Sequence, residues 1–364
     1  MPRELSKFPG KVVIVRRRLE YMDQFKGMLI FLVVLGHLVQ ELSAETTHHP
    51  FFNWIYAFHM PCFMFVTGYL AYLTFHGENF RQLISGIGNK VTTILVPYYT
   101  WLIFVYGPSF SGKWNLEIWD KLWNMTVGWS GLWFLKYVFI YYVIYAIALE
   151  LRNQTRARTG FVADCVIFLS GLATGLFLRK IVGGLDSYIL YGIFFFIGII
   201  FSKHECLKVW AANRFSVLLC AALFFVFVGK YDFHDRTLQN DFVKLVVSFS
   251  AICVFYNGYA ASQTKSILQR TLARYGKGTL AIYVSHFLFL RMITDDLPAI
   301  NALFFGIIVV ALSFMVIEVC LWINGLCSVS VYLRFLLYGG KISSLFGTDA
   351  LQKELSRPRN DVIS

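Results

Sequence analysis

Charge is scarce in this chain. Only 15% of its 364 residues are Asp, Glu, Lys or Arg, against about 25% in an ordinary soluble domain. Hydrophobic residues make up 57%, and a soluble chain of this length has no way to hide so much apolar surface from water. The composition therefore excludes a soluble enzyme, a nucleic-acid-binding module and a disordered protein. It indicates an integral membrane protein.

Familiar catalytic and metal-binding motifs are missing as well. The sequence has no GxSxG nucleophile elbow, no GxxxxGK[ST] phosphate loop, no HExxH and no run of acidic metal ligands. Its 7 cysteines are an odd number without CxxC spacing, so we expect neither a disulfide framework nor a metal site. Without a nucleophile motif, direct transfer assisted by a base is more economical than a covalent enzyme intermediate.

Long apolar runs dominate what is present. A spanning helix needs roughly 20 mostly apolar residues, and the chain offers about ten such runs. We therefore predict an all-α, polytopic membrane fold of about ten transmembrane helices. The predicted spans are 25–42, 53–75, 91–108, 129–149, 161–178, 185–202, 214–229, 242–261, 278–294 and 301–323.

The basic residues behind the formal charge of +12 are placed so that they indicate the membrane topology. Lys and Arg gather in every second connection, beginning with the cluster Arg16–Arg18, and by the positive-inside rule both termini are cytoplasmic. We predict a basic cytoplasmic segment (1–20), a transmembrane domain (21–341) and a polar cytoplasmic tail (342–364), in the plasma membrane. No nucleic-acid partner is expected, and the sequence leaves open whether the chain forms a homo-oligomer.

Two apolar segments are predicted to lie in the membrane interface without spanning it. Residues 109–128 place four Leu and Trp side chains on one helical face, and residues 328–340 are too short to span. We expect an interfacial helix in each.

Ionisable side chains at membrane depth are costly, so each is a functional candidate. The candidates that lie at depth in the predicted spans, away from their ends, are His37, His59, Lys136, His286 and Glu318. At a rise of about 1.5 Å per residue, the three histidines reach one layer of the membrane if their helices are neighbours. Glu318 lies close to the cytoplasmic interface, where plain solvation is the simpler interpretation.

Lys26 and His37 share one face of the first span. Eleven helical steps of about 100° end about 20° beyond three full turns. Lys26 is therefore placed to meet an anionic group arriving from the cytoplasm, and His37 to take a proton from a hydroxyl. The alternatives are an ordinary basic anchor that snorkels to the headgroups for Lys26 and a packing histidine for His37.

The second span carries a proline beside its histidine. Pro61 follows His59 in FHMPCFMF and is expected to break or kink the helix, which frees backbone groups. Broken helices at membrane depth line cavities, which favours His59 as a cavity-lining residue. Lys136 is expected to pair with an acid or to meet an anionic acceptor.

At these residues the chain resembles a known family. Residues 21–39 (YMDQFKGMLIFLVVLGHLV) and 55–71 (IYAFHMPCFMFVTGYLA) resemble the opening of the acyltransferase family 3 membrane enzymes. Weaker matches follow in family order: KVTTILVPYYTW, GLWFLKYVFIYY, LYGIFFFIGIIFSK and RYGKGTLAIYVSHF. The resemblance implies a ten-helix enzyme that moves an acyl group, most often acetyl, from cytoplasmic acyl-CoA to a hydroxyl of an extracytoplasmic or lipid-linked glycan.

The resemblance also implies roles for individual residues. His37 matches the essential histidine of the family, Lys26 its basic partner, and His286 the histidine of a late IYxxH pattern. Asp23 matches an acid at the helix entrance and, with His59 and Lys136, is expected to line the cavity or meet the acceptor. The predicted acyl-CoA phosphate partners are Lys26, Arg81, Lys90 and Arg18.

The chain departs from the family pattern at two positions. Lys26 stands where Arg is commoner, and a lysine cannot form the bidentate fork of a guanidinium. Thr67 replaces the usual Ser before Gly68. We also expect no appended extracytoplasmic domain, because the tail is short and polar.

Two other functions fit the same residues. A proton-coupled transporter or flippase of a glycan or metabolite would use buried histidines as a relay, although no repeated half-sequence supports it. An N-acetyltransferase acting on a sugar amine would have the same architecture.

Overall fold

The computed structural model describes residues 5–8, 11–14, 19–43, 50–75, 77, 79–106, 126, 132–155, 186–235, 237–261, 266–290 and 301–340. Regular structure in these ranges is helical, except for a short antiparallel hairpin of β1 (Leu5–Phe8) and β2 (Lys11–Ile14). The all-α prediction therefore holds for the body of the chain and misses this hairpin.

Helices occupy the predicted spans wherever the structure describes them. They are α1 (Glu20–Leu42), α2 (Pro50–Thr74), α4 (Val96–Tyr106), α6 (Trp133–Thr155), α8 (Asp186–Lys203), α10 (Arg214–Val228), α11 (Leu238–Ala261), α13 (Thr279–Leu290) and α14 (Ala302–Cys327). The predicted span 161–178 and the predicted interfacial segment 109–128 lie outside the described residues, apart from Thr126.

Four described helices are long and apolar enough to cross a membrane: Glu20–Leu42, Trp133–Asn153, Leu238–Ala261 and Leu303–Cys327. A fifth is added if α8 and the following α9 (Glu205–Ala212), which are bent by 98° at a short break, count as one span. The chain is therefore a multi-pass membrane protein, whereas the number ten and the cytoplasmic placement of both termini stay predictions.

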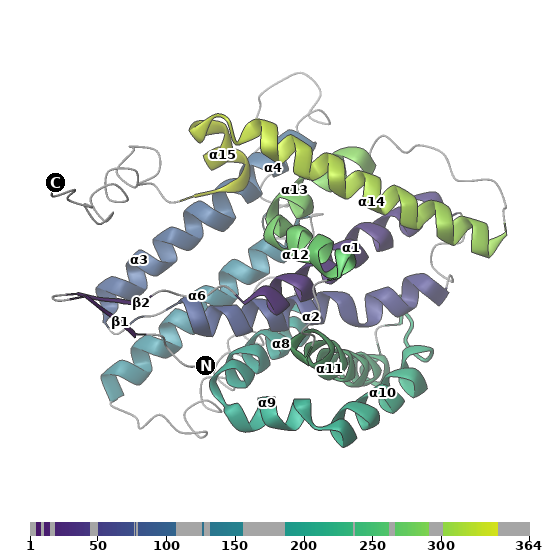
Figure 1. Cartoon of the computed structure of the whole chain (residues 1–364), viewed down its shortest axis with the longest axis horizontal. Helices are drawn as coiled ribbons and strands as arrows, with labels where there is room; N and C mark the ends of the chain where they lie inside the picture. Colours follow the sequence, from purple (N-terminus) through teal and green to yellow (C-terminus); the bar gives the residue numbers. More distant parts are fainter. Residues whose placement is uncertain are drawn as a thin grey trace, which may run out of the picture.

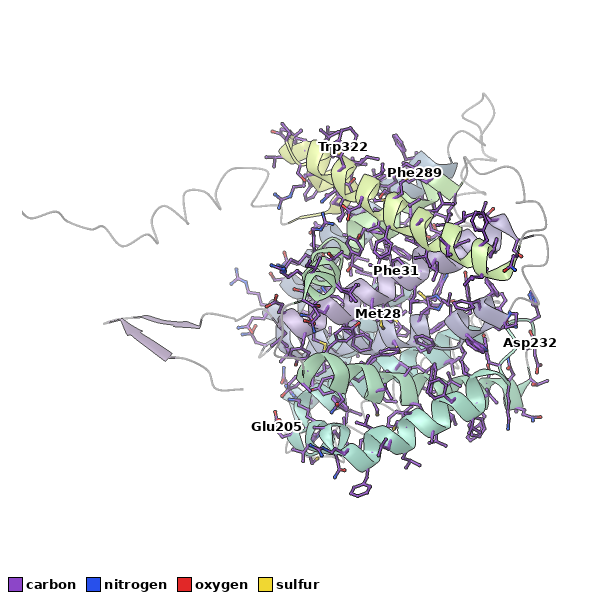
Figure 2. The ribbon with its side chains drawn as sticks, turned by 45° about the vertical axis from the view of Figure 1, so that its right-hand side comes forward. Met28, Phe31, Glu205, Asp232, Phe289 and Trp322 are labelled. Carbon is purple, nitrogen blue, oxygen red and sulfur yellow. The ribbon has the colours of Figure 1, made fainter. Side chains whose placement is uncertain are left out.

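Helices α1 and α2 run through the middle of the bundle (Figure 1). One side of this pair is covered by α12 (Ile267–Lys277), α13 and α14, and the other by α8, α10 and α11. Figure 2 shows Glu205 and Asp232 at opposite ends of the bundle, with Met28 and Phe31 between them. We call the end that carries Lys26, Lys90 and Lys277 the basic end, and the opposite one the far end.

Short helices fill connections that the apolar pattern left unassigned. Besides α9 they are α3 (Phe80–Lys90) and α12, and α12 begins with a capping box between Ser266 and Gln269. A π-helical segment, η2 (Val91–Leu95), joins α3 directly to α4. The predicted short helix at 328–340 is present as α15 (Val331–Tyr338), and the Trp101 indole donates to its Leu337 carbonyl at 2.7 Å.

Glycines allow two pairs of helices to pack backbone against backbone. A Cβ on Gly276 of α12 would lie 1.8 Å from the Asp23 carbonyl oxygen, and one on Gly27 of α1 equally close to the Leu272 carbonyl oxygen. In the same way, Gly68 of α2 lies against the Phe195 carbonyl of α8, and Gly198 of α8 against the Phe65 carbonyl of α2. In a membrane, where lipid tails remove the hydrophobic drive between helices, small residues make such close packing possible.

Of the break or kink predicted at Pro61, the break is wrong, because α2 continues as a helix through this residue. Proline has no N–H, so the carbonyl of Ala57 loses its usual partner four residues on. The Ser248 hydroxyl of α11 donates to the Ala57 carbonyl oxygen at 2.9 Å. The Ala57 carbonyl therefore obtains its hydrogen bond from a neighbouring helix and does not need to face a cavity.

Candidate active site

A cavity of about 360 Å³ opens near the basic end of the bundle. Lys26 of α1, Lys90 at the end of α3 and Lys277 at the end of α12 line it, together with Thr67, Thr93 and Tyr142. Three helices from distant parts of the chain thus bring three cations to one opening. Such an opening attracts an anion, since each ammonium group offers three hydrogen-bond donors.

Two of these lysines are held in place by neighbouring groups. The Lys26 ammonium lies 2.9 Å from the Asp23 carboxylate one turn earlier on α1. The Lys90 ammonium lies 3.9 Å from the ring centroid of Tyr142. Lys277 is exposed on the last turn of α12.

The inner part of the cavity approaches the predicted histidines. Val33 of α1 and Tyr283 of α13 line the cavity, as does Met60 of α2. Val33 precedes His37 by four residues and Tyr283 precedes His286 by three, so each pair shares a helix face. The ring centroids of Tyr283 and His286 are 5.9 Å apart. The cavity therefore ends about one helical turn from the histidines.

The three histidines gather in one layer, which the depth argument allowed if their helices were neighbours. The ring centroids of His37 and His286 lie 5.4 Å apart. Tyr56 lies between His37 and His59, with its ring centroid 6.4 Å from that of His37 and 4.8 Å from that of His59. His59 and His286 are buried, whereas His37 is half-buried.

Two of the histidines hydrogen-bond to their own helices. The Nδ1 atom of His59 lies 2.6 Å from the Ile55 carbonyl oxygen, and that of His286 lies 3.1 Å from the Ile282 carbonyl oxygen. Because a carbonyl only accepts, each Nδ1 carries the hydrogen and each neutral ring leaves Nε2 unprotonated. The Nε2 atom of His286 is buried and has no hydrogen-bond partner among the described residues.

Other predicted site residues are not brought to the cavity. Arg81 is exposed on the first turn of α3, about 13 Å along the helix from Lys90. Lys136 is half-buried on α6, with its ammonium 5.7 Å from the Tyr137 ring centroid. Arg18 lies outside the described residues. Glu318 receives hydrogen bonds from Arg274 and from the Tyr275 hydroxyl, so it joins α14 to α12.

Some residues of the site were missed in the sequence. Lys277 belongs to one of the basic connections that indicate only topology, and Tyr56 has no predicted role, although it lies three residues before His59. Lys244 is buried on α11 and donates to the hydroxyls of Tyr231 and Tyr191 at 3.2 and 3.4 Å. It is the third residue of the predicted span 242–261, where a lysine reaches the interface, but α11 begins four residues earlier, at Leu238, so Lys244 lies deeper in the helix.

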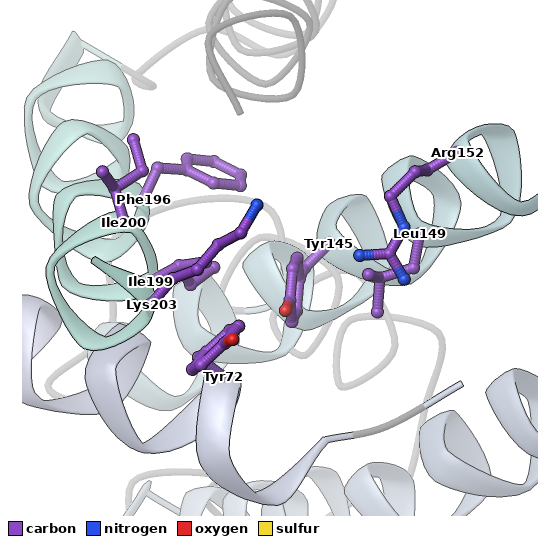
Figure 3. Close-up of a pocket in the computed structure, with 8 residues that line it drawn as sticks. All are labelled: Tyr72, Tyr145, Leu149, Arg152, Phe196, Ile199, Ile200 and Lys203. Carbon is purple, nitrogen blue, oxygen red and sulfur yellow. The ribbon is translucent and has the colours of Figure 1, made fainter. Parts of the chain in front are cut away.

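A second, smaller cavity of about 20 Å³ lies between the ends of α2, α6 and α8. Figure 3 shows Arg152 of α6 and Lys203 of α8 on opposite sides of it, with Tyr145 between them and Tyr72 below. It has room for about one water molecule, so it does not hold a substrate. Within the described ranges, no three His, Cys, Asp or Glu side chains are grouped so as to hold a metal ion.

Comparison with known proteins covers most of the chain. The family model described as an acyltransferase domain, acyltransferase family 3, matches residues 19–323. The chain is similar to Nodulation protein NolL of Mesorhizobium japonicum, with 26% identity over 234 residues, or 60% of this chain and 59% of that protein. It is also similar to Nodulation protein NolL of Sinorhizobium fredii, with 39% identity over 87 residues, 23% of each chain.

These alignments span less than two thirds of either relative, and no solved structure matches the chain. The family match, in contrast, runs from the start of α1 into α14 and contains the three lysines of the cavity and the three histidines. On this match the protein is a member of acyltransferase family 3.

Proposed function

We propose that the protein transfers an acyl group, acetyl in the simplest case, from cytoplasmic acyl-CoA to a hydroxyl of an extracytoplasmic or lipid-linked carbohydrate. It would do so in the plasma membrane, with the basic end and both termini in the cytoplasm. The observation that carries the proposal is the cavity, which leads from three lysines to within about one helical turn of His37 and His286.

The donor would enter from the basic end. The phosphates of CoA would bind Lys26, Lys90 and Lys277, with the nucleotide outside and the acyl-pantetheine arm in the cavity. A volume of about 360 Å³ is at the lower end of small-molecule sites and suits an arm better than the whole coenzyme. Since Lys26 stands where family members commonly have Arg, two further lysines would supply the contacts that a single ammonium lacks.

The acceptor would meet His37 from the far end. His37 is half-buried and Gln40, one turn closer to the far end, is exposed. The hydroxyl of the acceptor would give its proton to His37 while its oxygen bonds to the thioester carbonyl carbon. The carbon–sulfur bond then breaks, and the thiolate of CoA takes the proton from the imidazolium. His286 would contact the reacting groups through its unpartnered Nε2 atom.

The test is release of CoA thiol by the purified protein in nanodiscs, supplied with acetyl-CoA and a panel of sugars and glycan extracts. We expect release that depends on an acceptor, and loss of about 10²- to 10⁴-fold in His37→Ala. The matched control is His234→Ala, because His234 is exposed and does not line the cavity.

Calorimetric titration of the same samples with CoA separates the alternatives. Binding that survives in His37→Ala while transfer is lost supports the role of His37 as a base. Full transfer in His37→Ala contradicts that role. Failure of the wild-type protein to bind CoA contradicts acyl-CoA as the donor and favours the transporter function. Mass analysis of the product as an ester or an amide distinguishes the O-acyl from the N-acyl reaction.

A further inference from the structure

Tyr56 is wedged beside His37 by aromatic packing. Its ring stacks on Phe52 at a centroid distance of 4.0 Å and meets Phe233 edge-on at 4.9 Å. On the α1 side, a Cβ on Gly36 would lie 3.0 Å from Cε2 of this ring, so glycine leaves the space that the tyrosine occupies. The phenol ring therefore has little freedom to move away from His37.

The hydroxyl of Tyr56 lies between two side chains of α1. Its oxygen is 3.4 Å from Nδ1 of His37 and donates to Oε1 of Gln40 at 3.3 Å. A phenol has a single hydrogen to donate. If that hydrogen goes to Gln40, the hydroxyl oxygen is an acceptor toward His37, and Nδ1 of His37 carries the hydrogen.

The other two histidines show what is special about this arrangement. His59 and His286 obtain their Nδ1 acceptors from the carbonyls of their own helices. His37 instead has side-chain partners, Tyr56 of the neighbouring helix at 3.4 Å from Nδ1 and Gln40 of its own helix. The tautomer of His37 is therefore tied to the packing of α1 against α2, whereas those of the other two are set locally.

We infer that Tyr56 is a positioning residue, which with Gln40 holds His37 in the tautomer that has its hydrogen on Nδ1 and its lone pair on Nε2. The tautomer rests on the donation of the single Tyr56 hydrogen to Gln40, and its catalytic value rests on the proposed function. In the acyl transfer, Nε2 accepts the proton of the acceptor hydroxyl, and the Nδ1–H bond to Tyr56 steadies the charge that develops on the ring. A histidine held in the wrong tautomer is a poor base, as the serine protease triad illustrates.

Nitrogen-15 spectra of the full-length protein in nanodiscs, with ring-labelled histidine, test this directly. Protonated and unprotonated imidazole nitrogens have well-separated shifts, and His37→Ala identifies the signals of His37. We expect Nδ1–H in the wild type. Tyr56→Phe, which keeps the ring packing, should give a mixture of tautomers, and Gln40→Leu should shift His37 toward Nε2–H because Tyr56 is then free to donate to Nδ1.

Kinetics provide the second readout. Tyr56→Phe should lower kcat by about 10- to 100-fold, the range of one hydrogen bond to a charged group, while KM for acetyl-CoA stays within about twofold. Tyr21→Phe is the control, since it also removes a tyrosine hydroxyl hydrogen bond, to Tyr69 at 3.0 Å, away from the histidines. Gln40→Glu, which keeps an acceptor, should retain the Nδ1–H tautomer.

The two proposals fail in different ways. An Nε2–H tautomer in the wild type, or an unchanged tautomer and kcat in Tyr56→Phe, overturns the role of Tyr56. If the spectra behave as expected but the protein transfers no acyl group to any acceptor, the positioning of His37 stands and the proposed function is wrong.

Discussion

The Asp23 carboxylate and the Lys26 ammonium lie 2.9 Å apart on the first turns of α1, at the mouth of the cavity. The Asp23 side chain is 5% exposed and that of Lys26 20%. A lysine that only anchors a helix extends toward the headgroups. This one turns back to a buried acid, which orients the ammonium toward the cavity and compensates its charge there.

The Asp23–Lys26 pair predicts an asymmetric double-mutant cycle. Lys26→Gln leaves the buried Asp23 carboxylate without its ammonium partner and should destabilise the protein by about 2 kcal/mol. Asp23→Asn should cost less, because the half-buried Lys26 can reach water. Adding Asp23→Asn to Lys26→Gln should recover most of the loss. Thermal unfolding in detergent measures all four proteins, and additive effects would show that the pair is not coupled.

The lysines at the cavity mouth should act together on the donor. We expect Lys90→Gln and Lys277→Gln each to weaken CoA binding about tenfold, the effect of losing one charge-assisted hydrogen bond to phosphate. Lys208→Gln is the matched control, because Lys208 is a basic-end lysine that pairs with the exposed Glu205 at 2.7 Å and does not line the cavity. Equal weakening in the control would mean that only general surface charge attracts CoA. Calorimetry gives the Kd values.

The close packing of α2 and α8 should tolerate no side chain at Gly198. A Cβ there would lie 2.1 Å from the Phe65 carbonyl oxygen, so Gly198→Ala must push the helices apart, at a cost of about 2 kcal/mol or more. Gly306→Ala in α14, where nothing lies within 4 Å, should be neutral or slightly stabilising because alanine favours the helix. The two thermal midpoints are compared, and equal values contradict the packing argument.

The Ser248 hydroxyl should matter only while residue 61 is proline. Ser248→Ala removes the donor to the Ala57 carbonyl and should cost about 1 kcal/mol. Pro61→Ala restores a backbone N–H that can bond to the same oxygen, so in this background the cost of Ser248→Ala should fall toward zero. Unfolding by denaturant measures the coupling, and an unchanged cost would assign the role of Ser248 to packing.

Local features of the fold were predictable because they depend on neighbours in the chain. Apolar length predicted a helix at each described span, and helical spacing placed Lys26 and His37 on one face of α1. Pro61 frees a backbone carbonyl as expected but does not break the helix, since a hydroxyl 187 positions later in the sequence compensates it. The short helices α3 and α12 were also missed, because polar amphipathic segments carry no spanning signal.

The site shows the same division. His37, His286, His59, Lys26 and Lys90 were singled out by charge at membrane depth or by family resemblance, and the structure places them at the cavity or in the layer beyond it. Arg81 shared those grounds and lies elsewhere on α3. Lys277 and Tyr56 had no signal of their own, because an ordinary loop lysine and an ordinary aromatic side chain have the same local pattern.

By itself the sequence determined that this protein lies in a membrane, where its helices are and which residues are costly to bury. These features depend on composition and on spacing along one helix. Only the tertiary structure decided which costly residues meet. His37 faces His286 across 249 positions of sequence, and three lysines from separate segments share one opening. Such contacts arise from how the helices pack, and glycines such as Gly27 and Gly276 set how closely they do so.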